Sequence, residues 1–150
     1  MRWIYPERCG AVLALRFNFA RAMRSAPETP AGMAAQKDFV REYMSSLPET
    51  WDDVKFIDGY PGKFVVLARQ KGKRWYIAGI NGENSERTIT LNVPFINDKS
   101  KGILITDAVG VKDFIKSDVD FSAPIKITMY PYGGFVIKTI VPENKAGSNK

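Results

Sequence analysis

Two apolar runs separated by a short polar turn lie at the centre of the chain. Residues 64–68 and 75–80 are rich in Phe, Val, Trp, Tyr and Ile, and the polar residues 70–74 between them include Gly72. This pattern predicts a β-hairpin, because such side chains fit a pleated surface and glycine favours the turn. Neither run alternates strictly between apolar and polar residues, so both faces should be partly covered. We therefore expect the hairpin in the middle of a sheet rather than at an edge.

Shorter segments with strand-like patterns flank this hairpin, and turn signals such as Asp58-Gly59 separate them. In residues 87–93, Ile89, Leu91 and Val93 alternate with polar residues, as expected for a half-buried strand. Residues 113–120 form a charged connection that fits either a loop or a short strand. The remaining expected strands are 54–59, 102–111, 125–129 and 135–141. About seven short strands with turns between them predict an antiparallel β-sandwich.

An amphipathic helix is expected before the strands, over residues 33–47, and it should end before Pro48. Its apolar residues recur at helical spacing, and they are Phe39, Val40, Tyr43, Met44 and Leu47. Such a stripe is typical of packing, so we expect it to be buried against the sandwich or against another chain. The predicted fold class is thus all-β, an antiparallel β-sandwich of immunoglobulin-like type preceded by one amphipathic α-helix.

The first 32 residues differ in character from the rest. Every basic residue in 1–24 is Arg, the first Lys is Lys37, and residues 25–32 contain two prolines, as in a linker. We expect 1–32 to be an atypical leader and linker, disordered or helical, and 33–150 to hold the helix and the sandwich. The apolar run 11–15 is too short for a convincing signal peptide, so the localisation stays open.

Length and charge exclude several classes of protein. A chain of 150 residues suffices for one domain with a core, and no stretch approaches the roughly 20 apolar residues that span a membrane. The net charge of +6 is spread along the chain, with Lys and Arg interleaved with Asp and Glu. Nucleic-acid-binding proteins usually carry a basic cluster or stripe. We therefore expect neither a membrane span nor a nucleic-acid partner.

The chain has no histidine and a single cysteine, Cys9. These absences exclude Ser-His-Asp and Cys-His catalysis and ordinary zinc sites within the chain. Carboxylate chemistry stays open in principle. We expect no resident cofactor.

Several aspartates are candidates for carboxylate chemistry, but none forms a convincing site. Asp52 and Asp53 are adjacent, so on a strand they point to opposite faces. Asp118 and Asp120 would share one face of a strand, an arrangement that calcium could use. Such carboxylates are more commonly solvated groups in turns and loops. The same explanation applies to Asp107 and Asp113. We therefore assign no catalytic and no metal-binding residue.

Four aromatic residues, Trp51, Tyr60, Trp75 and Tyr76, could in principle form a platform for a sugar ring. Aromatic residues in strands more often belong to a core or an interface. Trp75 lies within an apolar run, and we expect it in the core. Trp51 and Tyr60 are therefore the candidate carbohydrate contacts.

Three motifs, in this order, resemble the C-terminal domain of glycoside hydrolase family 97, a family of calcium-dependent α-glucosidases and α-galactosidases. They are P-x-T-W-D within 48–52, A-R-x-K-G-x-x-W-Y over 68–76 and P-x-G-G-F over 131–135. The resemblance covers about residues 34–140. It implies a small β-sandwich, associated with oligomerisation, that follows a β-domain and a (β/α)₈ catalytic barrel in the complete enzymes.

The resemblance also implies that this chain is not an enzyme. The family's catalytic carboxylates and calcium ligands belong to the upstream domains, and a (β/α)₈ barrel takes ~250 residues. We expect a fragment or relative of a glycoside hydrolase: a non-catalytic accessory or oligomerisation domain acting in packing or subunit contacts. The alternatives are a carbohydrate-binding module that uses exposed aromatics and a small enzyme that uses the Asp pairs. The expected partners are a second copy, a glycosidase catalytic domain or a carbohydrate. The resembled family is mostly periplasmic or secreted.

Overall fold

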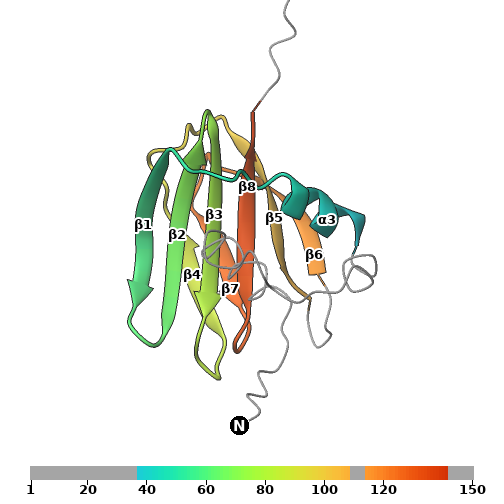
Figure 1. Cartoon of the computed structure of the whole chain (residues 1–150). Helices are drawn as coiled ribbons and strands as arrows, with labels where there is room; N and C mark the ends of the chain where they lie inside the picture. The colour runs from blue at the N-terminus through green and yellow to red at the C-terminus, as the bar shows by residue number, and fades with distance from the viewer. Residues whose placement is uncertain (1–36, 109–113, 142–150) are drawn as a thin grey trace, which may run out of the picture.

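The computed structural model describes residues 37–108 and 114–141 (Figure 1). The predicted leader and linker, the first part of the predicted helix (33–36), Cys9 and Asp113 lie outside these residues. One helix and eight strands are described. They are α3 (Asp38–Ser45), β1 (Asp53–Tyr60), β2 (Phe64–Lys71), β3 (Arg74–Asn81), β4 (Arg87–Leu91), β5 (Lys101–Asp107), β6 (Phe114–Asp120), β7 (Ile125–Met129) and β8 (Gly134–Ile140).

The strands form two antiparallel sheets. The larger sheet has the order β1-β2-β3-β8-β5-β6, and the smaller one pairs β4 with β7. The all-β, antiparallel prediction is confirmed. The central hairpin is β2–β3, whose turn contains Gly72 with φ of 58°. Neither of its strands lies at an edge, as the sequence predicted.

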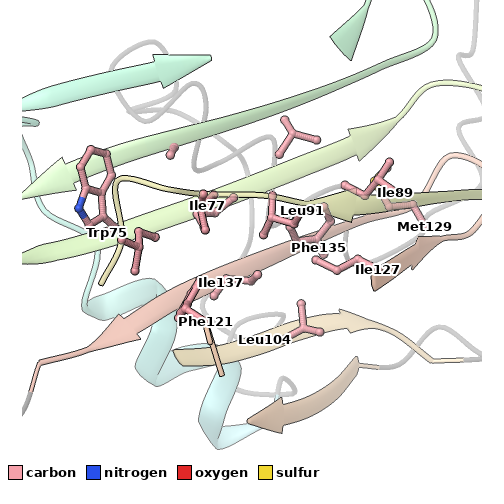
Figure 2. Close-up of a cluster of buried hydrophobic side chains, with 14 residues drawn as sticks. Trp75, Ile77, Ile89, Leu91, Leu104, Phe121, Ile127, Met129, Phe135 and Ile137 are labelled. Carbon is pink, nitrogen blue, oxygen red and sulfur yellow. The ribbon is translucent and has the colours of Figure 1, made fainter. Parts of the chain in front are cut away.

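The main core lies between the two sheets. Side chains from the inner face of the large sheet, among them Ile77, Phe135 and Ile137, pack against Leu91 and Met129 of the small sheet (Figure 2). Alternation in β4 and β7 places one face of each strand in this core and the other in water. We call the face of the large sheet that packs on β4 and β7 the inner face.

Trp75 belongs to this core, as predicted. Its side chain is 8% exposed, and its ring centroid lies 4.5 Å from that of Phe95. The neighbouring Tyr76 points to the opposite face of β3, because successive residues of a strand alternate in direction. Tyr76 is 3% exposed and belongs to a second cluster, on the outer face of the sheet.

Helix α3 covers part of that outer face, on the β5–β6 side of the sheet (Figure 1). Val40 and Tyr43 are buried, and Phe39, Met44 and Leu47 are partly buried against the same cluster. The sheet contributes Tyr76, Ala78, Ile105, Phe114 and Val136. The predicted burial of the apolar stripe against the sandwich is therefore confirmed.

The helix ends earlier than the predicted Leu47. The hydroxyl groups of Ser45 and Ser46 donate to the carbonyl oxygens of Glu42 and Tyr43, at 3.0 and 2.7 Å. Serine competes in this way with the backbone ladder, which favours a helix end. The Tyr76 hydroxyl also donates to the Ser46 carbonyl, at 3.1 Å, and this bond fixes the chain as it leaves the helix.

The charged segment 113–120, whose pattern fits either a loop or a short strand, contains strand β6. All seven residues of β6 pair with β5 in continuous antiparallel register, from Phe114 opposite Asp107 to Asp120 opposite Lys101. The polar pattern alone does not decide between a loop and a strand. The backbone pairing with β5 makes this segment a strand. The strand expected at 102–111 ends at Asp107, and residues 109–113 lie outside the described part of the chain.

Candidate functional site

The outer face of the large sheet carries an apolar surface on β1, β2 and β3. Register places these side chains on one face, since Phe56 lies opposite Leu67, and Leu67 lies opposite Ala78 of the α3 cluster. Val54 is 53% exposed and Phe56 is 66% exposed. We call this surface the outer patch, and it consists of Val54, Phe56, Val65, Leu67 and Ile80.

Helix α3 does not reach the outer patch. The helix lies on the β5–β6 side of the sheet, whereas β1 and β2 lie at the other side (Figure 1). The apolar cluster around α3 takes in Ile80 at its border but not Val54, Phe56, Val65 or Leu67. Exposed apolar patches on small proteins often mark contacts with other molecules. The outer patch is thus the described surface best suited to packing against another domain.

Trp51 lies at one end of this patch and is half-buried. Its ring meets Tyr76 edge-on, with centroids 5.2 Å apart, and the Arg69 guanidinium lies 5.6 Å from the indole centroid. Burial lowers the pKa of Arg69, which stays protonated at neutral pH because guanidinium titrates far above it. The indole of Trp51 is thus engaged by an aromatic edge and a cation.

Tyr60 lies at the far end of β1, next to the β1–β2 turn, and it is 61% exposed. The Lys63 ammonium group lies 5.1 Å from its ring centroid. Beside it is an open, largely apolar hollow of about 560 Å³, lined by Phe56, Tyr60, Pro61, Phe64, Val65 and Ile80 among others. The outer patch therefore continues into a depression at this end.

The structure separates the four aromatic candidates for a sugar platform. Trp51 and Tyr60 flank the two ends of the eight-residue strand β1, so roughly 25 Å of strand lies between them. Trp75 and Tyr76 are buried on opposite faces of β3. The four rings cannot form one platform, and a sugar contact at Trp51 or Tyr60 stays a prediction.

Asp52 and Asp53 support local structure. The Asp52 carboxylate accepts from the Gly72 N–H at 2.8 Å and from the Lys71 ammonium at 3.0 Å, and these bonds lower the pKa of Asp52. Asp53 pairs with Lys55 at 3.1 Å and accepts from the Val54 N–H, which together lower its pKa. Each carboxylate is engaged by its own cation, so they do not form a catalytic pair.

The other aspartates are equally dispersed. Asp118 and Asp120 are exposed on β6, and Asp120 accepts from the Ser122 N–H at 2.9 Å, which lowers its pKa. Asp107 is buried and accepts from the Gly134 N–H at 3.1 Å, and so fixes the start of β8. Within residues 37–108 and 114–141, no three His, Cys, Asp or Glu side chains gather as a metal site. No helix in these ranges is long and apolar enough to cross a membrane.

Two features were not foreseen from the sequence. The outer patch was missed, although Val54 and Phe56 flank Lys55 in an alternating pattern that indicates two differently used faces. The second is Asn81, which is buried and whose amide donates to the carbonyls of Ser85 and Tyr130, at 2.7 and 3.1 Å. A polar residue at the end of a long apolar run was the available signal.

Comparison with known proteins identifies the domain. A family model described as the C-terminal, oligomerisation domain of glycosyl hydrolase family 97 matches residues 50–140. The chain belongs to this family. The match falls within the range over which the three motifs indicated the resemblance, and it spans the sheets just described.

Proteins similar to this family 97 C-terminal domain are much longer chains. A retaining α-galactosidase of Bacteroides thetaiotaomicron is 30% identical over 137 residues, which cover 84% of this chain and 20% of the relative. A probable retaining α-galactosidase of Streptomyces bingchenggensis is 33% identical over 79 residues, covering 49% of this chain and 12% of that one. The chain thus spans no more than a fifth of the curated relatives it matches.

Solved structures support the same fold. A β-arabinopyranosidase superposes with a TM-score of 0.67 at 26% identity, covering 74% of this chain and 18% of that one. A glycoside hydrolase family 97 enzyme from Pseudoalteromonas sp. strain K8 superposes with a TM-score of 0.65 at 21% identity, covering 74% and 19%. In each case the matched region is a minor part of a larger enzyme.

Proposed function

We propose that this chain is a non-catalytic accessory domain that makes packing contacts, and that the outer patch is seated on a glycoside hydrolase catalytic domain. The observation that carries the proposal is the exposure of Val54 and Phe56 on a sheet face whose other half is already covered by α3. A protein surface that is flat, apolar and partly exposed gains stability when a neighbour removes it from water.

The nature of the partner follows from the relatives. In the α-galactosidase of Bacteroides thetaiotaomicron, the matched segment is a fifth of the chain, so most of that chain lies outside it. A family 97 C-terminal domain in such a chain has the remaining domains as its nearest neighbours. The outer patch is apolar along β1 and β2, as expected of a surface that packs within one protein rather than a transient polar contact.

Arg69 adds a polar contact at the border of the patch. Its guanidinium lies on Trp51, and its position on β2 is opposite Val54 on β1. An interface with an apolar centre and a charged rim is the usual arrangement at protein contacts. Phe56, which is the most exposed large apolar residue of the patch, is the natural anchor.

The test is binding to a related catalytic part. The partner is the α-galactosidase of Bacteroides thetaiotaomicron from which the segment matched by this chain has been removed. Sedimentation velocity with fluorescently labelled chain should show a complex, and Phe56→Asp should weaken it about tenfold or more, as expected for an interface anchor. Phe56→Asp should leave the thermal midpoint almost unchanged, because the side chain is exposed.

The matched control is Ile140→Asp. Ile140 is 46% exposed on β8, outside the patch, so the variant makes the same chemical change away from β1 and β2. It should bind like the unmodified chain. Equal binding by Phe56→Asp and the unmodified chain, or a larger loss with Ile140→Asp, would place the contact elsewhere.

One observation favours a second candidate, the carbohydrate-binding module. Tyr60 presents a largely exposed ring beside the hollow at the β1–β2 turn, with Lys63 and Asp58 nearby in sequence as polar groups. Affinity electrophoresis in gels containing galactose- or glucose-based polysaccharides separates the two functions. Retardation that is lost in Tyr60→Ala would support the module, whereas equal mobility of both proteins supports the packing role.

A further inference from the structure

Among the residues that the structure describes, strand β6 is a regular edge of the large sheet with no further strand beside it. It is the last strand in the order β1-β2-β3-β8-β5-β6, and its pairing with β5 runs through seven residues without a shift. The opposite edge differs, because the register of β1 shifts between Phe56 and Asp58. Bulges of this kind twist an edge away from further pairing. Of the two edges, β6 is the one that another strand can extend.

The backbone groups that face outward can be assigned. The Phe121 N–H donates to the Ser100 carbonyl at 3.2 Å, so Phe121 faces β5. In an antiparallel ladder, residues alternate between facing the partner strand and facing away. Lys116, Asp118 and Asp120 therefore direct their backbone N–H and C=O groups to the open edge. The Phe114 carbonyl accepts from the Lys37 ammonium group at 3.2 Å, as expected of a group that this alternation directs away from β5.

The side chains of β6 are self-complementary. Lys116 and Asp118 lie opposite Ile105 and Ile103, so they belong to the outer face, and both are exposed. Ile115 and Val119 belong to the inner face, where Ile115 is 44% exposed. A positive and a negative residue thus flank Ser117 on one face, and two apolar residues flank it on the other.

Only one register uses this complementarity fully. A two-fold axis through Ser117 places Lys116 opposite Asp118 of a second copy, twice, and Ile115 opposite Val119. An axis through Lys116 or through Asp118 places like charges directly opposite each other, and an axis through Val119 opposes Asp118 with Asp120. Like charges directly opposite are destabilising, whereas opposite charges and apolar pairs are favourable. The axis through Ser117 also opposes Lys116 and Asp118, whose backbone groups both face outward, as a hydrogen-bonded pair requires.

We propose that two copies of this chain pair antiparallel through β6, about an axis at Ser117, to form one continuous sheet of six strands from each copy. The axis is normal to the sheet, so both α3 helices lie on the same face. Phe114, which Lys37 contacts, is three residues or about 10 Å from Ser117, so the helices begin on opposite sides of the axis. The proposal goes beyond the packing role, because it uses the edge farthest from the outer patch.

The first test is a charge exchange, measured on the full chain by sedimentation over a range of protein concentrations. The unmodified chain should form a dimer. Lys116→Asp and Asp118→Lys should each raise the dimer dissociation constant about tenfold, because each places like charges opposite at two symmetric positions. The double variant K116D/D118K restores opposite charges and should dimerise like the unmodified chain. Both substituted side chains are exposed in the monomer, so folding should be preserved.

The second test fixes the register. In a Cys9→Ser background, Ser117→Cys should form an intermolecular disulfide under mild oxidation, because residues opposite each other at a non-hydrogen-bonded position have Cβ atoms close enough for that bond. The control is Thr90→Cys, which is exposed on β4 of the small sheet. It should run as a monomer on a denaturing gel without reducing agent. Selective cross-linking of Ser117→Cys supports the pairing.

Several outcomes would overturn the β6 dimer. They are a monomer mass at every concentration up to about 100 µM, a dimer that neither single charge variant weakens, or a double variant no better than the singles. Phe56→Asp separates this proposal from the packing role. It should leave the dimer unchanged while weakening the contact with the catalytic part, so either interface can fail without the other.

Discussion

A glycine beneath a phenylalanine ring provides a direct test of the core. Gly79 lies in the middle of β3, opposite Phe135 of β8, on the inner face of the large sheet. A Cβ atom at Gly79 would lie 2.2 Å from the Cε1 atom and 2.9 Å from the Cζ atom of Phe135. Phe135 is fully buried between the sheets. The variant Gly79→Ala must therefore displace a ring that has packed neighbours on all sides.

The size of the effect follows from that overlap. Inserting one methyl group into a well-packed core costs about 1–3 kcal/mol, and a contact of 2.2 Å against a fully buried ring calls for the upper end. The lower chain entropy of alanine in the unfolded state returns about 0.4–1 kcal/mol. We expect a net loss of about 2 kcal/mol, which lowers the thermal midpoint by roughly 8 °C for a domain of this size.

Circular dichroism during heating, together with urea unfolding, measures this loss. A double-mutant cycle combines this variant with Phe135→Leu, which removes the part of the ring that the new methyl group meets. Gly79→Ala combined with Phe135→Leu should cost clearly less than the sum of the two single changes, since residues in contact couple by about 0.5–3 kcal/mol. A midpoint for Gly79→Ala equal to or above that of the unmodified chain would show that the ring does not cover Gly79.

Two further changes test other parts of the same account. Trp75→Ala should lower the free energy of unfolding by about 3 kcal/mol. This is the lower end of the range for a large aromatic residue, because the indole is 8% exposed and borders a hollow near Phe95 and Ile96. An unchanged urea midpoint would place Trp75 at the surface. Asp52→Asn should reduce the fall of the thermal midpoint as the pH becomes acidic. The pKa of Asp52 is lowered in the fold by the Gly72 N–H and Lys71, so its stabilisation is present above the ordinary aspartate pKa and disappears as the pH falls through the lowered value. Thermal midpoints measured between about pH 2 and 6 check this. An equal fall of the midpoint in Asp52→Asn and in the unmodified chain would show that the carboxylate does not hold the turn.

Much of the fold follows from local patterns in the sequence. The apolar runs of β2 and β3 predict strands that are partly covered on both faces and lie away from an edge, and these strands are indeed interior. The stripe on α3 predicts burial, and Val40 and Tyr43 are buried. Such patterns are read within a single element, so the order of the strands is not needed to interpret them.

The positions of surfaces depend on which strands become neighbours, and local pattern does not determine that. Val54 and Phe56 alternate with Lys55 in the same way whether their face is covered by a helix or open. Their exposure follows from the return of β8 and β5 beside β3, which places α3 at the other side of the sheet. The open edge at β6 has the same origin, because its polar pattern fits both a loop and an edge strand.

The same reasoning explains the candidate sites. Trp51 and Tyr60 are nine positions apart, and only the extended course of β1 shows that their rings lie far from each other. Asp118 and Asp120 share one face of a strand, as predicted, but no third carboxylate joins them within the described residues. Spacing along a strand predicts a shared face and gives no information on what faces it from the next element.

We propose, as the central point, that this family 97 C-terminal domain acts through contacts and carries no active site of its own. Turnover of aryl α-galactosides and aryl α-glucosides by the purified chain, with and without calcium, tests this claim most directly. The account predicts no turnover above a matched blank under either condition. Turnover that is abolished by Asp118→Asn or Asp120→Asn would contradict it and would locate an active site on β6.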